Sequence, residues 1–176
     1  MIYSRVARRV AALMLLACSA GGWAQPKSDW EREDEERNWK EIEVALPRAP
    51  QREDRLPFFG GSGQDMRFFV DRASISAGAD GVVRFSLIAV SPEGAENISA
   101  EGVRCRSGEY KTYAIGRADG TWSRREGNWR RGMQRWQQAL RAEFFCPQGV
   151  PITTAAEGVD ALRRGGHPHK GHTSRD

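Results

Sequence analysis

The sequence predicts a small α+β domain in which an antiparallel sheet is covered by one helix near the carboxyl end. The middle of the chain holds short segments rich in β-branched and aromatic residues, separated by turn residues. An apolar repeat at helical spacing follows the last of these segments. A charged run with a helix-starting pattern precedes the first, which predicts a helical arm in front of the domain.

Residues 1–24 have the three parts of a signal peptide for export. Arg5, Arg8 and Arg9 form a basic start, residues 10–20 form an apolar core, and Gly22-Trp23-Ala24 is a small-x-small end. The core is shorter than the roughly 20 residues of a membrane span, so we expect no transmembrane segment after signal removal. Cleavage after Ala24 would place the protein in the periplasm of a bacterium.

Cys18 leaves a second interpretation open. The run Leu15-Leu16-Ala17-Cys18 resembles a lipobox, in which Cys18 would be acylated and would become the new N-terminus of an outer-membrane lipoprotein. Leu16 is a poor residue at its lipobox position, and cleavage at Cys18 leaves a short apolar core. Cleavage after Ala24 is therefore the favoured expectation.

Residues 25–56 are expected to form an acidic helical arm followed by a proline-rich linker. Ser28 and Glu31 make a capping-box pattern, which predicts a short exposed helix to about Lys40. The prolines that follow end any helix and favour an extended chain. They are Pro47, Pro50 and Pro57.

The α+β domain is expected over residues 57–164, with a meander sheet of four to six strands. Asp80-Gly81 and Asp119-Gly120 are strong hairpin turns, and strands joined so tightly must be antiparallel. The predicted strands are Arg67–Val70, Ser74–Ala77, Val82–Val90, Asn97–Cys105 and Tyr110–Gly116.

Two helices are expected after the sheet. Met133, Trp136, Leu140 and Phe144 recur at helical spacing and predict one packed helix that ends before Pro147. A capping-box pattern at 154–157 predicts a second, short helix, which the glycines at 165–166 end. Residues 165–176 are then expected to be a disordered tail.

Cys105 and Cys146 are the two cysteines outside the signal. An even pair in an exported protein predicts a disulfide, here between the end of a strand and the end of the packed helix. The chain-entropy model gives roughly 3 to 4 kcal/mol for a loop of this length. The pair has no C-x-x-C spacing and no nearby histidine, which argues against a redox or metal site.

The formal charge excludes a general attraction to nucleic acid. Loss of the three signal arginines lowers the net charge from +4 to +1. The remaining charge is uneven, because residues 28–54 carry ten acids and five bases while residues 122–145 carry six arginines and two acids. The two segments either attract each other or each serve a partner.

The sequence does not predict a metal, a cofactor or an enzyme. His167, His169 and His172 are the only histidines, and a tail offers no supporting groups to orient them as metal ligands. Gly60–Gly63 lacks the lysine and hydroxyl of a phosphate loop. Carboxylates in or beside the predicted strands leave a carboxylate-based hydrolase as a distant alternative; they are Asp71, Glu101, Glu109 and Asp119.

One pattern resembles a surface made for a partner. Tryptophans recur every seven residues at 122, 129 and 136 among arginines, and aromatic residues with arginine are typical of binding hot spots. The predicted partner surface is Trp122, Trp129, Arg130, Arg131 and Arg135. The partner would be an unknown envelope protein or an anionic envelope component. In the competing interpretation Trp136 is core and the arginines are a solvated face.

A series of short motifs resembles the CNP1-like family of exported proteobacterial proteins. The motifs include Arg67–Asp71, Gly102–Cys105, Gly108–Lys111, Asp119–Trp122 and Phe144–Pro147. That family is functionally uncharacterised, so the resemblance implies no catalytic residue.

The order of strands and cysteines is also similar, more loosely, to the surface-adhesin protein E type of small envelope protein. We therefore expect a non-catalytic binding or assembly module in the periplasm. A surface-displayed adhesin-like protein or a lipoprotein is the alternative.

Overall fold

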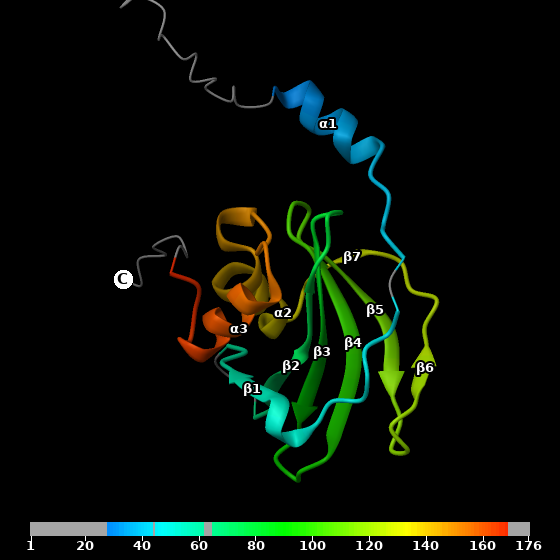
Figure 1. Cartoon of the computed structure of the whole chain (residues 1–176), viewed down its shortest axis with the longest axis vertical. Coiled ribbons are helices and arrows are strands. Elements are labelled where there is room, and N and C mark those ends of the chain that lie inside the picture. Colours follow the sequence, from blue (N-terminus) through cyan, green and yellow to red (C-terminus); the bar gives the residue numbers. More distant parts are fainter. Residues whose placement is uncertain (1–27, 44, 62–64, 169–176) are drawn as a thin grey trace, which may run out of the picture. The chain divides into compact units, whose positions relative to one another are not determined.

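The computed structural model shown in Figure 1 describes residues 28–43, 45–61 and 65–168. The chain divides after Trp39 into two units. The first contains the helix α1 (Asp29–Arg37), and the second, which begins at Lys40, contains every other element. The predicted signal peptide and Cys18 lie outside the described residues.

Helix α1 begins as its capping box predicts. The Ser28 hydroxyl accepts the backbone N–H of Glu31, and the Glu31 carboxylate accepts the N–H of Ser28 at 2.8 Å. The helix ends at Arg37, a little before the predicted end near Lys40, where the N–H of Asn38 bonds to the carbonyl oxygen of Asp34. None of its residues is buried, so its stability comes from the cap and from local charge pairs.

The second unit is built on an antiparallel sheet, which confirms the predicted fold class, and its seven strands exceed the four to six expected. Six strands follow one another across the sheet in chain order, and the last strand pairs beside the sixth on β5. Their bounds are β1 Arg55–Phe58, β2 Arg67–Ala77, β3 Val82–Val90, β4 Glu96–Arg104, β5 Glu109–Gly116, β6 Trp122–Arg124 and β7 Arg130–Arg131.

The first part of the sheet differs in detail from the expectation. Two predicted strands are one strand, β2, which a bulge between Asp71 and Ser76 interrupts. Ser74 bridges the bulge, since its hydroxyl donates to the Asp71 carbonyl oxygen and accepts the N–H of Ser86, both at 2.7 Å. Strand β1 was not predicted because it contains Pro57, and a strand at the sheet edge tolerates a residue without an N–H.

Four helical segments cover one face of the sheet (Figure 1). They are α2 Arg135–Ala139, the π-helix η2 Leu140–Phe145, the 3₁₀ turn η3 Pro147–Gly149, and α3 Ala155–Arg163. The predicted packed helix is therefore an α-helix that continues as a π-helix. Met133 lies before it and is 77% exposed, whereas Trp136, Leu140 and Phe144 are buried in the core against the sheet.

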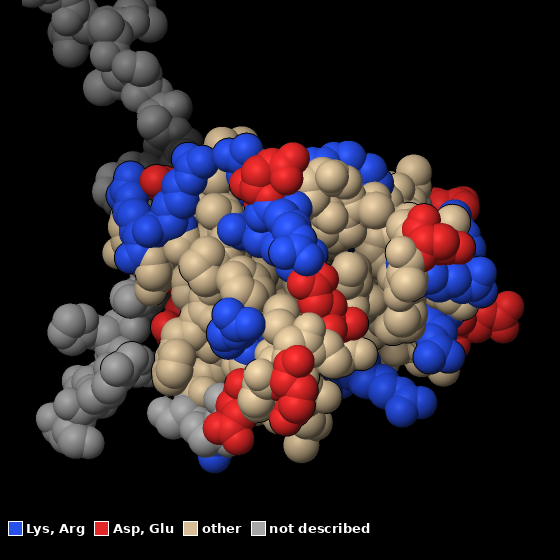
Figure 2. Space-filling view, turned by 90° about the horizontal axis from the view of Figure 1, so that it is seen from below, with Lys and Arg blue, Asp and Glu red and all other residues tan. Residues whose placement is uncertain are grey.

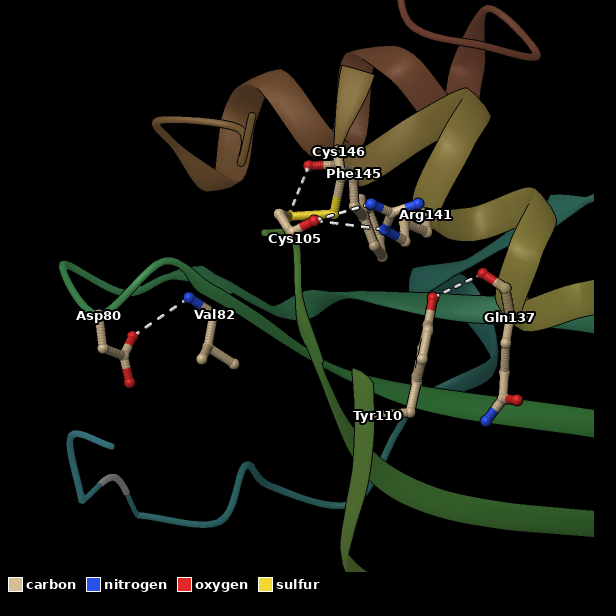
Figure 3. The surroundings of a disulfide bond; sticks show 8 residues. All are labelled: Asp80, Val82, Cys105, Tyr110, Gln137, Arg141, Phe145 and Cys146. Carbon is tan, nitrogen blue, oxygen red and sulfur yellow. Dashed lines mark hydrogen bonds between the residues drawn. A yellow bond between two sulfur atoms is a disulfide. The ribbon is translucent and has the colours of Figure 1, made fainter. Parts of the chain in front are cut away.

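The predicted disulfide is present and joins the sheet to these helices (Figure 3). Cys105 directly follows β4, Cys146 directly follows η2, and their Cα atoms are 5.3 Å apart. The guanidinium of Arg141 donates to the carbonyl oxygen of Cys105 at 3.0 Å, which adds a second link at the same place. A separation of 41 residues corresponds to about 4 kcal/mol in the chain-entropy model.

The prediction that the tail begins at residue 165 is wrong for His167. Its side chain is 4% exposed, its ring lies 2.8 Å from the Glu157 carboxylate, and its N–H donates to the carbonyl oxygen of Glu143 at 2.6 Å. Two glycines at 165–166, with φ of 71° and 156°, turn the chain back toward α3. His169 and His172 lie outside the described residues.

Residues 40–43 and 45–54 cover the other face of the sheet, and we call this segment the strap. It runs across the strands toward β1 in Figure 1 and ends in the 3₁₀ turn η1, Arg52–Asp54. Val82, Ile88 and Ala114 point to this face and are fully buried although they lie outside the helix-side core. The predicted linker is thus extended, but it belongs to the same compact unit as the sheet.

Candidate functional site

The first anchor of the strap is the carboxylate of Glu41. It accepts hydrogen bonds from Lys111 Nζ at 2.8 Å, the Tyr113 hydroxyl at 2.7 Å and the Trp129 indole at 3.2 Å. Burial opposes ionisation of Glu41, but these three donors outweigh it and lower the pKa of the carboxyl. Lys111 also lies 5.3 Å from the centre of the Tyr113 ring, so the cluster combines charge with cation–π attraction.

The second anchor is a buried ion pair that holds the backbone of Ile42. The guanidinium of Arg84, a residue only 5% exposed, donates to the Asp80 carboxylate at 2.6 Å and to the Ile42 carbonyl oxygen at 3.1 Å. The same carboxylate accepts the N–H of Ile42 at 2.9 Å. One charge pair therefore satisfies both backbone polar groups of a single strap residue, as strand pairing would do.

Trp122 provides the third anchor. Its indole N–H donates to the carbonyl oxygen of Pro47 at 2.7 Å. Two tryptophans of the predicted partner surface, Trp122 and Trp129, thus hold the strap, and both are half-buried. Trp136 is core, between Phe68 and Tyr110, as the competing interpretation expected. The three tryptophans thus lie in different parts of the fold: Trp122 begins β6, Trp129 lies in the loop before β7, and Trp136 lies in α2.

Four arginines lie along the sheet edge formed by β6 and β7, and we call this set the arginine edge. Backbone pairing of both short strands with β5 places the set along one edge of the sheet. All four side chains are exposed, and none has a hydrogen bond or an ion pair within the described residues. They are Arg124, Arg125, Arg130 and Arg131. The predicted Arg135 begins α2 instead.

A pocket of about 370 Å³ opens between the far end of the strap and the sheet. Ala49 and Pro50 line it from the strap, and Ile98, Gly116 and Trp122 line it from three neighbouring strands. Sequence reasoning missed this site because residues 49–50 form it only by packing against strands more than 40 residues away.

The family model of the CNP1-like family matches residues 34–163, which include the strap, the disulfide, the arginine edge and the pocket. The chain belongs to the CNP1-like family. No curated protein and no solved structure matches this CNP1-like chain.

The carboxylates of the hydrolase alternative lie apart in this CNP1-like protein. Asp71 points to the strap face, whereas Glu101 points to the helix face. Glu109 pairs with Arg104 at 3.6 Å, and Asp119 accepts from the Thr121 N–H within its own turn. The structure therefore does not bring these four groups together as a catalytic pair.

Among these four carboxyls, Glu101 has the largest shift in pKa. Burial raises the pKa of its carboxyl to about 7, against hydrogen bonds from Ser99 and Thr112 that oppose the shift. Both oxygens lie 3.0 Å from the Thr112 hydroxyl.

Two further findings concern the described residues as a whole, namely metal ligands and membrane-spanning helices. No group of three His, Cys, Asp or Glu side chains in this part of the chain is arranged to hold a metal ion. No helix within the same ranges combines the length and hydrophobicity needed to cross a bilayer.

Proposed function

We propose that this CNP1-like protein is a non-catalytic binding module of the bacterial cell envelope and that its partner binds the arginine edge. The observation that carries this proposal is the absence of acidic partners for four neighbouring arginines within the described residues. Other arginines of the same unit are ion-paired to carboxylates, among them Arg48, Arg55, Arg72 and Arg84.

The arginine edge is held firmly enough to act as a recognition surface. Strands β6 and β7 are paired to β5, and Trp122 and Trp129 tie the flanking chain to the strap. Guanidinium groups match carboxylate and phosphate groups in a two-bond geometry. The proposed partner is therefore an acidic segment of an envelope protein or an anionic envelope component.

Protection of the sheet edge is a second physical role for these arginines, and it leads to a different expected result. Charges on edge strands prevent sheets from pairing edge to edge, and they do so without a partner. If this were their whole role, replacing them with glutamate would leave the oligomeric state of the protein unchanged and would change no interaction in the cell.

The test is a photo-crosslinking amino acid at Asn128, an exposed residue between the two arginine pairs, in cells that express the full chain. We expect a discrete crosslinked product that the double change Arg130→Glu and Arg131→Glu removes. The matched control is Arg67→Glu with Arg163→Glu, since both residues are exposed arginines on other elements.

Unchanged crosslinking in the Arg130→Glu and Arg131→Glu protein, with its circular dichroism spectrum intact, would refute the surface assignment. Protection of the protein from protease added to intact cells supports the periplasm. Its digestion there would instead support the adhesin-like alternative.

A further inference from the structure

We propose that the pocket at the end of the strap binds a sugar, as one neutral pyranose ring stacked on Trp122. This site is separate from the arginine edge, and the inference does not depend on the function proposed above. It rests on the shape of the pocket, on the polar groups at its rim, and on their charge.

The apolar part of the pocket suits the face of a sugar ring. The Trp122 indole is fixed in place because its N–H is already bonded to the Pro47 carbonyl oxygen. Its ring therefore offers a flat surface rather than a donor, and the C–H face of a pyranose packs on such a surface. Pro50 and Ile98 add further apolar lining, and a volume of about 370 Å³ lies within the range of small-molecule sites.

The rim of the pocket carries both donors and acceptors. Arg117 makes a single side-chain hydrogen bond among the described residues, to the Ser123 hydroxyl at 3.4 Å, and so retains most of its N–H groups. Glu96 accepts two N–H groups of Arg55, at 2.7 and 2.9 Å, and keeps further lone pairs. A hydroxyl group both donates and accepts, so the hydroxyls of a sugar match this mixed rim.

The charge around the pocket favours a neutral ligand over an ion. The charge of Glu96 is balanced by Arg55, and Arg117 lies near the Asp119 carboxylate of the same hairpin turn. Figure 2 views the molecule from the end at which this hairpin lies, and basic and acidic residues are interspersed there. An anion would find no single-sign field at this end of the molecule.

The experiment is an NMR titration of the ¹⁵N-labelled protein with methyl glycosides of glucose, galactose and N-acetylglucosamine. We expect at least one of them to shift the Trp122 indole N–H and the Gly120 and Thr121 amides saturably, with a Kd of about 1 to 10 mM for so small a ligand. Ala118→Trp should abolish the shifts, because Ala118 is exposed, lines the pocket, and would fill it without disturbing the core.

The matched control is Ala79→Trp, which places the same side chain on an exposed turn of the β2–β3 hairpin. This variant should bind the sugar as the original protein does, and so should the Arg130→Glu and Arg131→Glu protein. Absence of a saturable shift with all three glycosides would overturn the inference. So would unchanged binding by Ala118→Trp, or saturable binding of sodium acetate without binding of any sugar.

Discussion

Two buried charged residues of the sheet show opposite ways of placing an ionisable group inside a protein. Arg84 is paired with Asp80 and bonded to the strap, so burial does not leave its charge uncompensated. Glu101 has only hydroxyl partners and lies among core residues of the helix face. Its charge is therefore uncompensated, and the protonated form is favoured.

Glu101 should make folding weaker as the pH rises. The pKa of its carboxyl is about 7 in the folded protein, against an ordinary value of 4.5. Between these values the folded state binds the proton and the unfolded state does not, so this stabilisation is complete below about pH 4.5 and is lost as the pH rises through 7. Glu101→Gln should remove this dependence and should be more stable than the original protein at pH 8, by about 3 kcal/mol.

Urea unfolding at pH 5 and at pH 8 measures this effect. The control is Glu126→Gln, which changes an exposed carboxylate. If the original protein and Glu101→Gln lost the same free energy of unfolding between pH 5 and pH 8, Glu101 would not be the source of the pH dependence.

At the scale of elements, the two faces of the sheet differ in how strongly the segment that covers them is attached. The helix face is mostly apolar, with Glu101 as a buried ionisable group, and it is closed by the disulfide. The strap face contains all four buried polar side-chain atoms that lack a hydrogen-bond partner within the described residues. They are Arg55 Nε, Asp71 Oδ2, Arg84 Nε and Ser86 Oγ. Burial of a polar atom without a hydrogen-bond partner lowers the stability of the folded state. We therefore expect the strap to open before the helices do.

Glu41→Ala should loosen the strap. The change leaves Lys111, Tyr113 and Trp129 without their shared acceptor, and we expect a loss of about 1 to 3 kcal/mol in the free energy of unfolding. Hydrogen exchange should rise in residues 40–50 and in β5, and much less in α3. Mass spectrometry of exchanged peptides, together with urea unfolding, measures both effects.

Glu43→Ala is the matched control, since Glu43 is an exposed glutamate of the same segment. If both variants showed the same stability and the same exchange, Glu41 would not be an anchor of the strap.

At the scale of the whole molecule, the sheet needs a cover on each side. A fragment of residues 40–168 keeps the strap, and we expect it to unfold at the same temperature as the full chain. A fragment of residues 57–168 loses the strap and half of β1, which exposes Val82, Ile88 and Ala114 to water. We expect this shorter fragment to bind a hydrophobic dye and to melt at a lower temperature or without a cooperative transition.

Circular dichroism melting curves and dye fluorescence of the two fragments test this expectation. Equal melting temperatures would mean that the domain begins at 57, as the composition of the chain indicates, and that the strap is only a linker.

Local patterns predicted much of this molecule. The predicted bounds of β3, β4 and β5 agree closely with those observed, because long β-rich runs end at glycine turns. Strands β1, β6 and β7 have four residues or fewer and show no usable periodicity. His167 was assigned to the tail because its glycine- and proline-rich surroundings carry no signal for the bonds it makes with Glu143 and Glu157.

The sequence by itself determined the α+β class, the Cys105–Cys146 disulfide and the resemblance to the CNP1-like family, because strand periodicity, cysteine number and short motifs are properties of neighbouring residues. Only the tertiary structure decided that Trp122 and Trp129 hold the strap, that four arginines share one edge, and that a pocket opens beside Trp122. The strap contacts and the pocket join segments 40 to 90 residues apart, and the arginine edge depends on the pairing of two short strands with β5. The energies of these features depend on contacts that form only when the whole chain has folded.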